Sequence, residues 1–318
     1  MGIASRLKPA RGPSASKPKK AEGELEAIEV HTEDGLALRA YVREPTVKCV
    51  GVAVLAHAMF ARSSQFERPH GRGLAQFLSE QGWRTVAFDF RGHGNSGASA
   101  SNGGRWTYDD LVRRDLPGVV ECARARKKRG EPVVVIGHSL GGHVAMAAQG
   151  LGVLEADALV AIATNVWLPH FEPSFLRWRA KQVSLRAMSA ITTSRGFFPA
   201  RALRMGSDDE SAPYVSALVR AVQEGRWTSD DGRDDYEQAL ENIKVPVLGI
   251  ASVADRLNCH PVCAERMLSK CGGEREFHLI THGDGDAPAP GHMELVTGEH
   301  ARGVWSGIAR FLSSVKRT

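Results

Sequence analysis

The chain has 318 residues, of which 42% are hydrophobic, so it can bury a large core and is not disordered throughout. Lysine and arginine outnumber aspartate and glutamate by 41 to 36, but six of the basic residues lie in the first 20 positions, where there is no acid. The rest of the chain is therefore close to neutral, which excludes the basic face that a nucleic-acid-binding protein requires.

Residues 1–23 contain three prolines and neither an apolar core nor an amphipathic stripe, which predicts a disordered basic tail. They do not resemble a secretory signal peptide, and Arg6 stands where a myristoylation motif requires serine or threonine. The longest apolar stretch, VGVAVLAHAMF, is too short to cross a bilayer. We therefore expect a soluble, cytoplasmic protein without an integral membrane segment.

Five cysteines are scattered along the chain, and this odd number favours reduced thiols over a disulfide framework. Cys259 and Cys263 flank His260, but their spacing does not suit a metal site, and helix packing explains these residues better. We expect neither a metal nor another cofactor.

The first predicted elements are two strands over residues 25–30 and 36–42, which a turn-prone segment joins into a hairpin. Further strands are predicted where short aliphatic runs alternate with segments of helical periodicity, at 50–56, 84–90, 133–136, 158–162, 245–250 and 276–280. This alternation is typical of the α/β fold class, with a mostly parallel central sheet of about eight strands flanked by helices.

Strand signals are absent between residues 162 and 245, a segment too long for a structureless loop. We expect an inserted, mainly helical cap or lid over residues 167–243, between core segments 24–166 and 244–318. The first half of the cap is basic and the second acidic, so the halves either neutralise each other or leave a basic lining that attracts anionic substrates. Its large apolar residues fit either an apolar acyl pocket or a packed cap core: Phe171, Phe175, Leu176, Trp178, Phe197 and Phe198.

The sequence VVVIGHSLGGHVA (133–145) places Ser139 between a buried strand and a helix. Gly137 and Gly141 permit the sharp backbone turn that such a connection requires. This nucleophile elbow would expose the Ser139 hydroxyl above the sheet, next to unpaired N–H groups at the helix N-terminus. A serine in this position needs a nearby base, and an acid to orient that base.

The segment GHGNSG (92–97) fits the dinucleotide-binding pattern G-x-G-x-x-G and follows a predicted strand. However, no helix opens directly after it, and it does not lie at the first strand-to-helix turn of the sheet, where such a site is expected. We interpret these glycines as shaping a loop beside the serine.

Asp255 lies just past the predicted strand at 245–250, at the carboxyl edge where α/β sheets place functional groups. His292 stands on a loop before the last predicted helix, from which an imidazole can reach the elbow. Asp255 and His292 are therefore our candidate acid and base for Ser139.

Other acids and histidines compete with these two residues less well. Asp284 and Asp286 lie in a loop rich in glycine and proline, where solvated turn residues are the better explanation. His282, just after a predicted strand, is the main alternative base. His138 and His143 flank the serine in sequence, and we expect them to pack away from its hydroxyl.

From about residue 24 to its end, the chain resembles an α/β-hydrolase fold protein. The resemblance rests on LAHAMFARS after the third strand, DFRGHGNSG after the fourth, GHSLGG at the elbow, and the chain order Ser139, Asp255, His292. Two further segments, GFFPARAL and DGRDDYEQALENIKVPVL, resemble a group of bacterial predicted hydrolases of unassigned substrate.

The resemblance implies an oxyanion hole made of the backbone N–H groups of Leu140 and Met59, and no cofactor. The family commonly has His-Gly at the end of the third strand, whereas this chain has His57 and Ala58. The second donor is therefore Met59 or Phe60.

The residues and the resemblance together predict a serine hydrolase that cleaves a carboxylic ester, or a related acyl bond, of a small-molecule substrate through an acyl-enzyme intermediate. Serine as the nucleophile argues against the dehalogenase and epoxide hydrolase members of the fold, which attack with a carboxylate. An acyltransferase, thioesterase, peptidase or lipase would use the same triad. A non-catalytic binding protein that keeps the fold is the alternative from another class, and the oligomeric state stays open.

Overall fold

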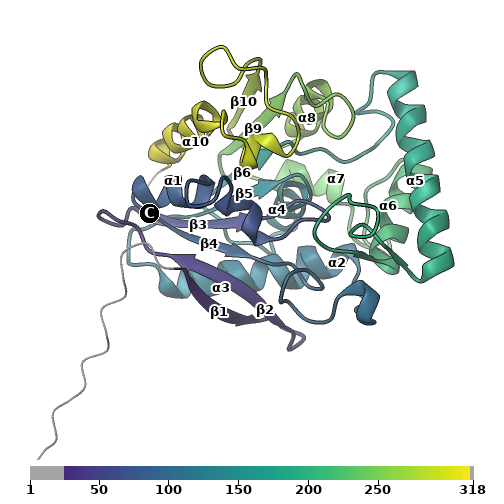
Figure 1. The fold of residues 1–318 in the computed structure, drawn as a ribbon, viewed down its shortest axis with the longest axis horizontal. Helices are drawn as coiled ribbons and strands as arrows, with labels where there is room; N and C mark the ends of the chain where they lie inside the picture. The colour runs from purple at the N-terminus through teal and green to yellow at the C-terminus, as the bar shows by residue number, and fades with distance from the viewer. Residues whose placement is uncertain (1–24, 316–318) are drawn as a thin grey trace, which may run out of the picture.

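The computed structural model describes residues 25–315, and the tail predicted at 1–23 lies outside them. Eight strands form one sheet in the order β1-β2-β4-β3-β5-β6-β9-β10, shown in Figure 1. β2 pairs antiparallel with β1 and β4, and the remaining pairs are parallel. The mostly parallel eight-stranded sheet predicted from the sequence is therefore confirmed. The strands are β1 (Glu26–His31), β2 (Ala37–Arg43), β3 (Gly51–Ala56), β4 (Trp83–Phe88), β5 (Val133–His138), β6 (Ala158–Ile162), β9 (Val247–Ser252) and β10 (Arg275–Ile280).

The central strands are hydrophobic throughout because both faces of the sheet are covered. Every residue of β3 and β5 is buried. Alternate residues of β3 enter different cores: Val52 and Val54 join one hydrophobic cluster, and Ala53 and Leu55 join the other. This explains why these strands read as continuous apolar runs rather than as an alternating pattern.

Helices pack on both faces of the sheet. α1 and α10 contribute to the cluster on one face, whereas α3 and α4 contribute to the cluster on the other. Among the helices of residues 25–315, none is both long enough and apolar enough to span a membrane. The helices are α1 (Leu74–Glu80), α2 (Tyr108–Asp110), α3 (Leu116–Arg126), α4 (Leu140–Gly150), α5 (Phe175–Arg195), α6 (Ala212–Glu224), α7 (Tyr236–Ala239), α8 (Pro261–Leu268), α9 (Glu294–Thr297) and α10 (Arg302–Ser314). Shorter helical turns are η1 (Ser63–Glu67), η2 (Ala100–Asn102), η3 (Leu111–Asp115) and η4 (Leu240–Asn242).

The long segment between β6 and β9 is built mainly from α5 and α6, which pack against each other at one side of the molecule (Figure 1). Each helix begins at a serine whose side chain accepts a hydrogen bond from the first turn, Ser174 for α5 and Ser211 for α6. Each ends at a left-handed glycine, Gly196 or Gly225. Two short strands, β7 (Phe197–Phe198) and β8 (Glu210–Ser211), connect the helices.

Candidate active site

Ser139 lies at a sharp turn between β5 and α4. Its backbone φ of 52° falls in the left-handed region, which residues with a Cβ adopt rarely. A Cβ on Gly137 or Gly141 would lie 2.3 or 2.2 Å from backbone atoms of neighbouring segments, so the turn requires both glycines. The Ser139 N–H donates to the carbonyl of Ile162 in β6 at 2.8 Å. The sheet thus holds the strained serine at its carboxyl edge.

Asp255 and His292 form a hydrogen-bonded pair at the same edge. Asp255 follows β9, and its Oδ2 accepts a hydrogen bond from Nδ1 of His292, while its Oδ1 accepts from the N–H of Cys259 at 3.0 Å. Burial raises the pKa of Asp255, but the hydrogen bond and charge of His292, together with backbone N–H donors, hold it below its ordinary value. An ionised Asp255 keeps the proton of the imidazole on Nδ1, which leaves Nε2 able to accept a proton.

His138, the last residue of β5, holds the backbone of His292. Its Nε2 donates to the carbonyl oxygen of His292 at 3.0 Å, and the two rings lie 5.1 Å apart. Burial lowers the pKa of His138 to about 3, so its ring is neutral at physiological pH. The sequence predicts only packing for the His138 side chain. Its contact with His292 could not be predicted, because 154 positions separate the two residues in the chain.

A cavity of about 560 Å³ opens beside the serine. Ser139, His292, Met59 and Leu140 line it. The rest of its wall is mostly apolar, and α5 and α6 contribute Leu185, Met188, Ile191, Ala217, Leu218, Ala221 and Val222 to it. Among the described residues that line the cavity there is no lysine, arginine, aspartate or glutamate. A volume of this size is typical of a site for a small molecule, for which the range is about 300–1,000 Å³.

The backbone N–H groups beside the serine differ in whether they are already bonded. The Phe60 N–H donates to Oε1 of Glu210 at 3.2 Å. Within residues 25–315, the N–H groups of Met59 and Leu140 have no acceptor. The sequence left Met59 and Phe60 as alternatives for the second donor. Of these two N–H groups, that of Met59 is therefore the one available to a ligand.

Two further polar side chains, His143 and Tyr108, line the cavity. The sequence predicts only packing for His143 and does not single out Tyr108. Nδ1 of His143 lies 2.9 Å from the Tyr108 hydroxyl. Burial lowers the pKa of His143 to about 3, so the ring is neutral. The available signal was its position four residues after Ser139, one turn further along the same face of α4.

The alternative acid and base residues lie away from the cavity. Asp284 accepts hydrogen bonds from the N–H groups of Arg302 and Gly303 at 2.9 and 2.7 Å and so caps α10. Asp286 and His282 are exposed. None of the three alternatives lines the cavity.

The large apolar residues of the segment between β6 and β9 have different surroundings. Phe198 lines the cavity, whereas Phe171 is buried in the core. Phe175 and Leu176 are 73% and 78% exposed. Neither interpretation of this set, as an acyl pocket or as a packed core, holds for all its members.

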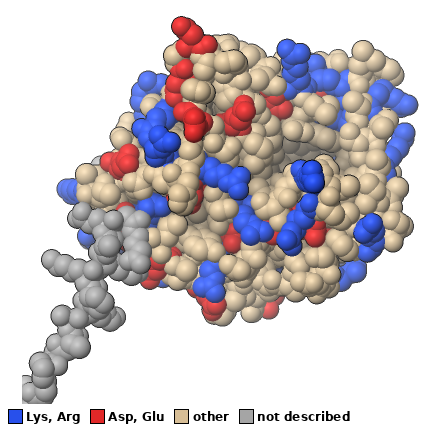
Figure 2. Space-filling model, in the orientation of Figure 1, with Lys and Arg blue, Asp and Glu red and all other residues tan. Residues whose placement is uncertain are grey.

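The basic side chains of the first half of this segment do not line the cavity. Arg179, Arg186 and Arg195 are exposed on α5, and blue side chains follow that side of the molecule in Figure 2. Lys181 is fully buried and pairs with Glu172 at 2.9 Å. His170 of the first half contacts Glu237 of the acidic half at 3.0 Å. Among the described residues, no lysine or arginine of the basic half forms an ion pair with the acidic half, and Asp230 and Asp235, for instance, pair with Arg220 and Arg226. The structure therefore favours neither the basic lining nor neutralisation between the halves.

Comparisons with known proteins place this chain in a family. The sequence pattern of the serine aminopeptidase S33 family of hydrolases matches residues 48–283. The chain therefore belongs to this family, and the resemblance to the α/β-hydrolase fold is confirmed. It is a hydrolase. No curated protein sequence matches the chain significantly.

Solved structures share the fold at low sequence identity. A structure of DcsB with a substrate analogue is 15% identical, with a TM-score of 0.64, and the match covers 93% of this chain and 100% of that one. A monoacylglycerol lipase of Paleococcus ferrophilus is 18% identical, with a TM-score of 0.59 and coverage of 88% and 99%. An esterase of Pyrococcus furiosus is 19% identical, with a TM-score of 0.60 and coverage of 97% and 97%. At these identities the similarity establishes the fold.

Proposed function

We propose that the protein hydrolyses carboxylic esters through a triad of Ser139, His292 and Asp255. The observation that carries the proposal is the arrangement around the cavity. The strained Ser139 and the Asp255-bound His292 both line it, beside the unbonded N–H groups of Met59 and Leu140. These are the components that an acyl-transfer site needs.

In the proposed reaction, Nε2 of His292 takes the hydroxyl proton of Ser139 as Oγ attacks the ester carbon. The carbonyl oxygen becomes an oxyanion that accepts hydrogen bonds from Met59 and Leu140. The carbon–oxygen bond to the alcohol then breaks, and His292 gives its proton to the leaving alcohol. Water attacks the acyl-enzyme in the same way, which releases the carboxylic acid and restores Ser139.

The lining of the cavity supports an uncharged, apolar ester as the substrate. Such a group gains free energy from the buried apolar wall, whereas a charged group would lose its hydration without a partner. The family description includes aminopeptidases, whose substrates carry a charged α-amino group. Among described residues, no carboxylate lines the cavity to receive that group, so an ester is favoured over a peptide.

We also propose that residues 167–243 form a cap. These residues, which include α5 and α6, supply most of the apolar wall, and without this wall Ser139 would face water. Exclusion of water strengthens the electrostatic stabilisation of a transition state.

The five cysteines, none of which is in a disulfide, support a reducing compartment such as the cytoplasm.

Labelling with a fluorophosphonate tests the proposed function without knowledge of the natural substrate. We expect intact-protein mass spectrometry to show one adduct, peptide mapping to place it on Ser139, and the adduct to be absent from His292→Ala. A folded wild-type protein that takes no label and hydrolyses no ester would instead favour a non-catalytic binding protein.

The size of the cavity predicts a limit on substrate length. Ala221 on α6 lines the cavity, so Ala221→Trp should shorten the space available to an apolar chain. Exclusion of two methylene groups, at about 0.8 kcal/mol each, corresponds to a loss of more than about tenfold in kcat/KM for long-chain esters. The acetate ester should change by less than about threefold.

A series of p-nitrophenyl esters from acetate to decanoate measures this effect. Ala180→Trp is the matched control, because Ala180 is exposed on α5 and does not line the cavity. Equal changes for all chain lengths in Ala221→Trp would contradict the assignment of this wall to the acyl chain.

A further inference from the structure

The loop that carries Met59 is held by a distant segment through the next residue, Phe60. The φ of Phe60 is 64°, so its backbone is in the left-handed region. The Phe60 carbonyl accepts hydrogen bonds from the N–H groups of Ser207 and Asp208 at 2.7 and 3.1 Å. Its N–H donates to Oε1 of Glu210 at 3.2 Å. Residues 207–210 therefore fix both peptide groups that flank Phe60, one of which is adjacent to the peptide that carries the Met59 N–H.

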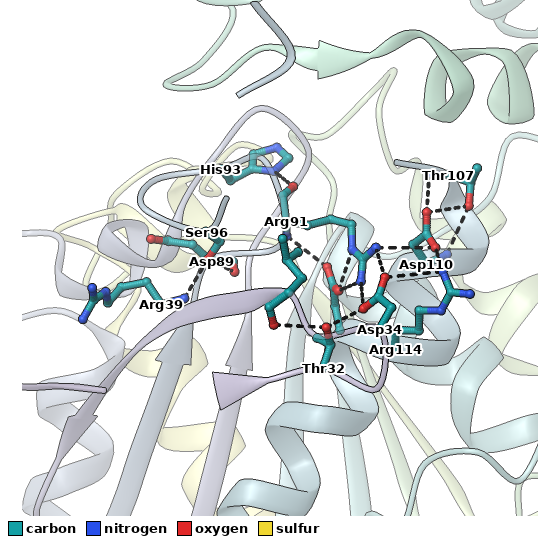
Figure 3. A network of polar contacts seen from close by, with 12 residues as sticks. Thr32, Asp34, Arg39, Asp89, Arg91, His93, Ser96, Thr107, Asp110 and Arg114 are labelled. Carbon is teal, nitrogen blue, oxygen red and sulfur yellow. Dashed lines mark hydrogen bonds and ion pairs between the residues drawn. The ribbon is translucent and has the colours of Figure 1, made fainter. Parts of the chain in front are cut away.

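Glu210 is itself held by a histidine from the loop GHGNSG. Oε1 of Glu210 accepts a hydrogen bond from Nε2 of His93 at 3.1 Å, and both side chains are buried. Nδ1 of His93 donates to the carbonyl oxygen of Arg91 at 3.1 Å, the contact drawn in Figure 3. Since both ring nitrogens face acceptors, the ring carries two N–H groups and a positive charge. Burial lowers the pKa of His93, but the charge and hydrogen bond of Glu210 outweigh burial and raise it to about 9.

The Arg91 carbonyl, which accepts the hydrogen bond from His93, is held in place by an ion-pair network around the Arg91 side chain. The Arg91 guanidinium contacts the buried carboxylate of Asp115 at 2.7 Å and the exposed carboxylate of Asp34 at 3.0 Å. The Arg91 N–H also donates to Asp115 at 3.0 Å. Figure 3 shows Arg91 between His93 and this cluster of carboxylates. The position of His93 is thus set from the body of the fold.

A second set of hydrogen bonds, made by Asp208, joins the segment 206–210 to the residues that follow Met59 and to the loop GHGNSG. Asp208 accepts two hydrogen bonds from the Arg62 guanidinium at 2.8 Å each, and another from the N–H of Gly94 at 3.2 Å. At Gly206 a Cβ would lie 2.3 Å from the Phe60 carbonyl oxygen, so the two segments approach closely. The segment 206–210 therefore packs against the loop of Met59 and against the glycine-rich loop together.

We propose that Glu210, oriented by His93, is a positioning residue of the oxyanion hole. Its carboxylate fixes the Met59–Phe60 peptide, and this orients the Met59 N–H toward the oxygen of the tetrahedral intermediate. Neither Glu210 nor His93 lines the cavity, so both act through the loop rather than on the substrate. The inference rests on the proposed ester hydrolysis at Ser139.

The geometry distinguishes the effects of two substitutions. Glu210→Ala removes the acceptor and leaves the Phe60 N–H and the Nε2–H of the His93 cation without a partner in a buried site. Glu210→Gln keeps an oxygen that can accept both hydrogen bonds but loses the negative charge. Asp209→Ala is the matched control, because Asp209 is a buried carboxylate of the same segment whose Oδ1 accepts from the Arg201 N–H instead of from the loop.

The experiment compares kcat and KM for a p-nitrophenyl ester with the inhibition constant of a trifluoromethyl ketone. Oγ of Ser139 adds reversibly to the carbonyl carbon of the ketone, while the hydroxyl proton of Ser139 moves to His292. The ketone oxygen becomes an oxyanion at the place where the intermediate has one. Loss of one oxyanion donor lowers kcat by about 10²–10³-fold, so a displaced donor should lower it by at least about tenfold in Glu210→Ala. The inhibition constant should rise by a similar factor, with KM changed by less than about threefold. Glu210→Gln should show a smaller loss, and Asp209→Ala should retain wild-type kcat.

The result that overturns the proposal is a folded Glu210→Ala protein with wild-type kcat or with unchanged affinity for the ketone. If Glu210→Ala does not fold, Glu210→Gln decides by the same two measurements. An inactive, unlabelled wild type would instead refute ester hydrolysis itself, so the two failures are distinguishable.

Discussion

Replacement of Ser139 by alanine should lower kcat for ester hydrolysis by about 10⁵–10⁶-fold. The nucleophilic oxygen is lost, while the cavity, the Asp255–His292 pair and the free N–H groups of Met59 and Leu140 are kept. KM should therefore change little. Alanine tolerates a positive φ about as poorly as serine does, so we expect a thermal unfolding temperature close to that of the wild type.

Measurement of kcat for hydrolysis of a p-nitrophenyl ester, and of the thermal unfolding temperature of the same samples, checks this expectation. Ser194→Ala is the matched control, because Ser194 is an exposed serine of α5 that bonds only to the carbonyl of Ile191. A Ser139→Ala protein that keeps more than a hundredth of the wild-type kcat would refute acyl-enzyme formation on this serine.

Asp255→Asn is expected to lower kcat by about 10⁴-fold while the protein stays folded. Asparagine nearly preserves the size of the side chain, but its amide can turn an N–H group toward Nδ1 of His292. The imidazole then carries its proton on Nε2, where it can no longer accept the proton of Ser139. The ionised carboxylate also stabilises the imidazolium that forms during the reaction, and asparagine does not.

The pH dependence of kcat and the rate of fluorophosphonate labelling both measure this loss. Asp286→Asn serves as the control, because Asp286 is exposed and lies outside the cavity. Labelling of Asp255→Asn at the wild-type rate would show that another group orients His292, and would remove Asp255 from the proposed triad.

Features that depend only on residues close together in the sequence could be predicted from the sequence. The run VVVI in β5 and the glycines around Ser139 impose a buried strand and a sharp turn whatever lies elsewhere. The same holds for the order of strands and helices, because hydrophobic periodicity is a local property. Asp255 could be chosen because the carboxyl ends of parallel strands meet at one edge of the sheet, and His292 because it stands on a loop before the last helix.

Contacts between distant segments could not be predicted in this way. Whether Met59 or Phe60 offers a free N–H depends on Glu210, which is 150 positions from Phe60 in the chain. The basic and acidic halves of the segment between β6 and β9 fit either mutual neutralisation or a basic cavity lining, yet Lys181 is buried against Glu172 of its own half. The number of basic and acidic residues in a segment does not determine which of them form ion pairs in the folded protein.

The orientation of α5 shows the same division. Its sequence predicts a helix, and Ser174 and Gly196 determine where that helix begins and ends. Only the packing of α5 on α6 decides that Leu185 and Met188 face the cavity while Phe175 and Leu176 face solvent. By itself, therefore, the sequence determined the sheet, the strained serine and the candidate acid and base, because backbone preferences and hydrophobic runs act over a few residues. The tertiary structure alone decided the shape of the cavity, the free N–H of Met59 and the Glu210–His93 pair, because these depend on hydrogen bonds and packing that form only when distant segments meet.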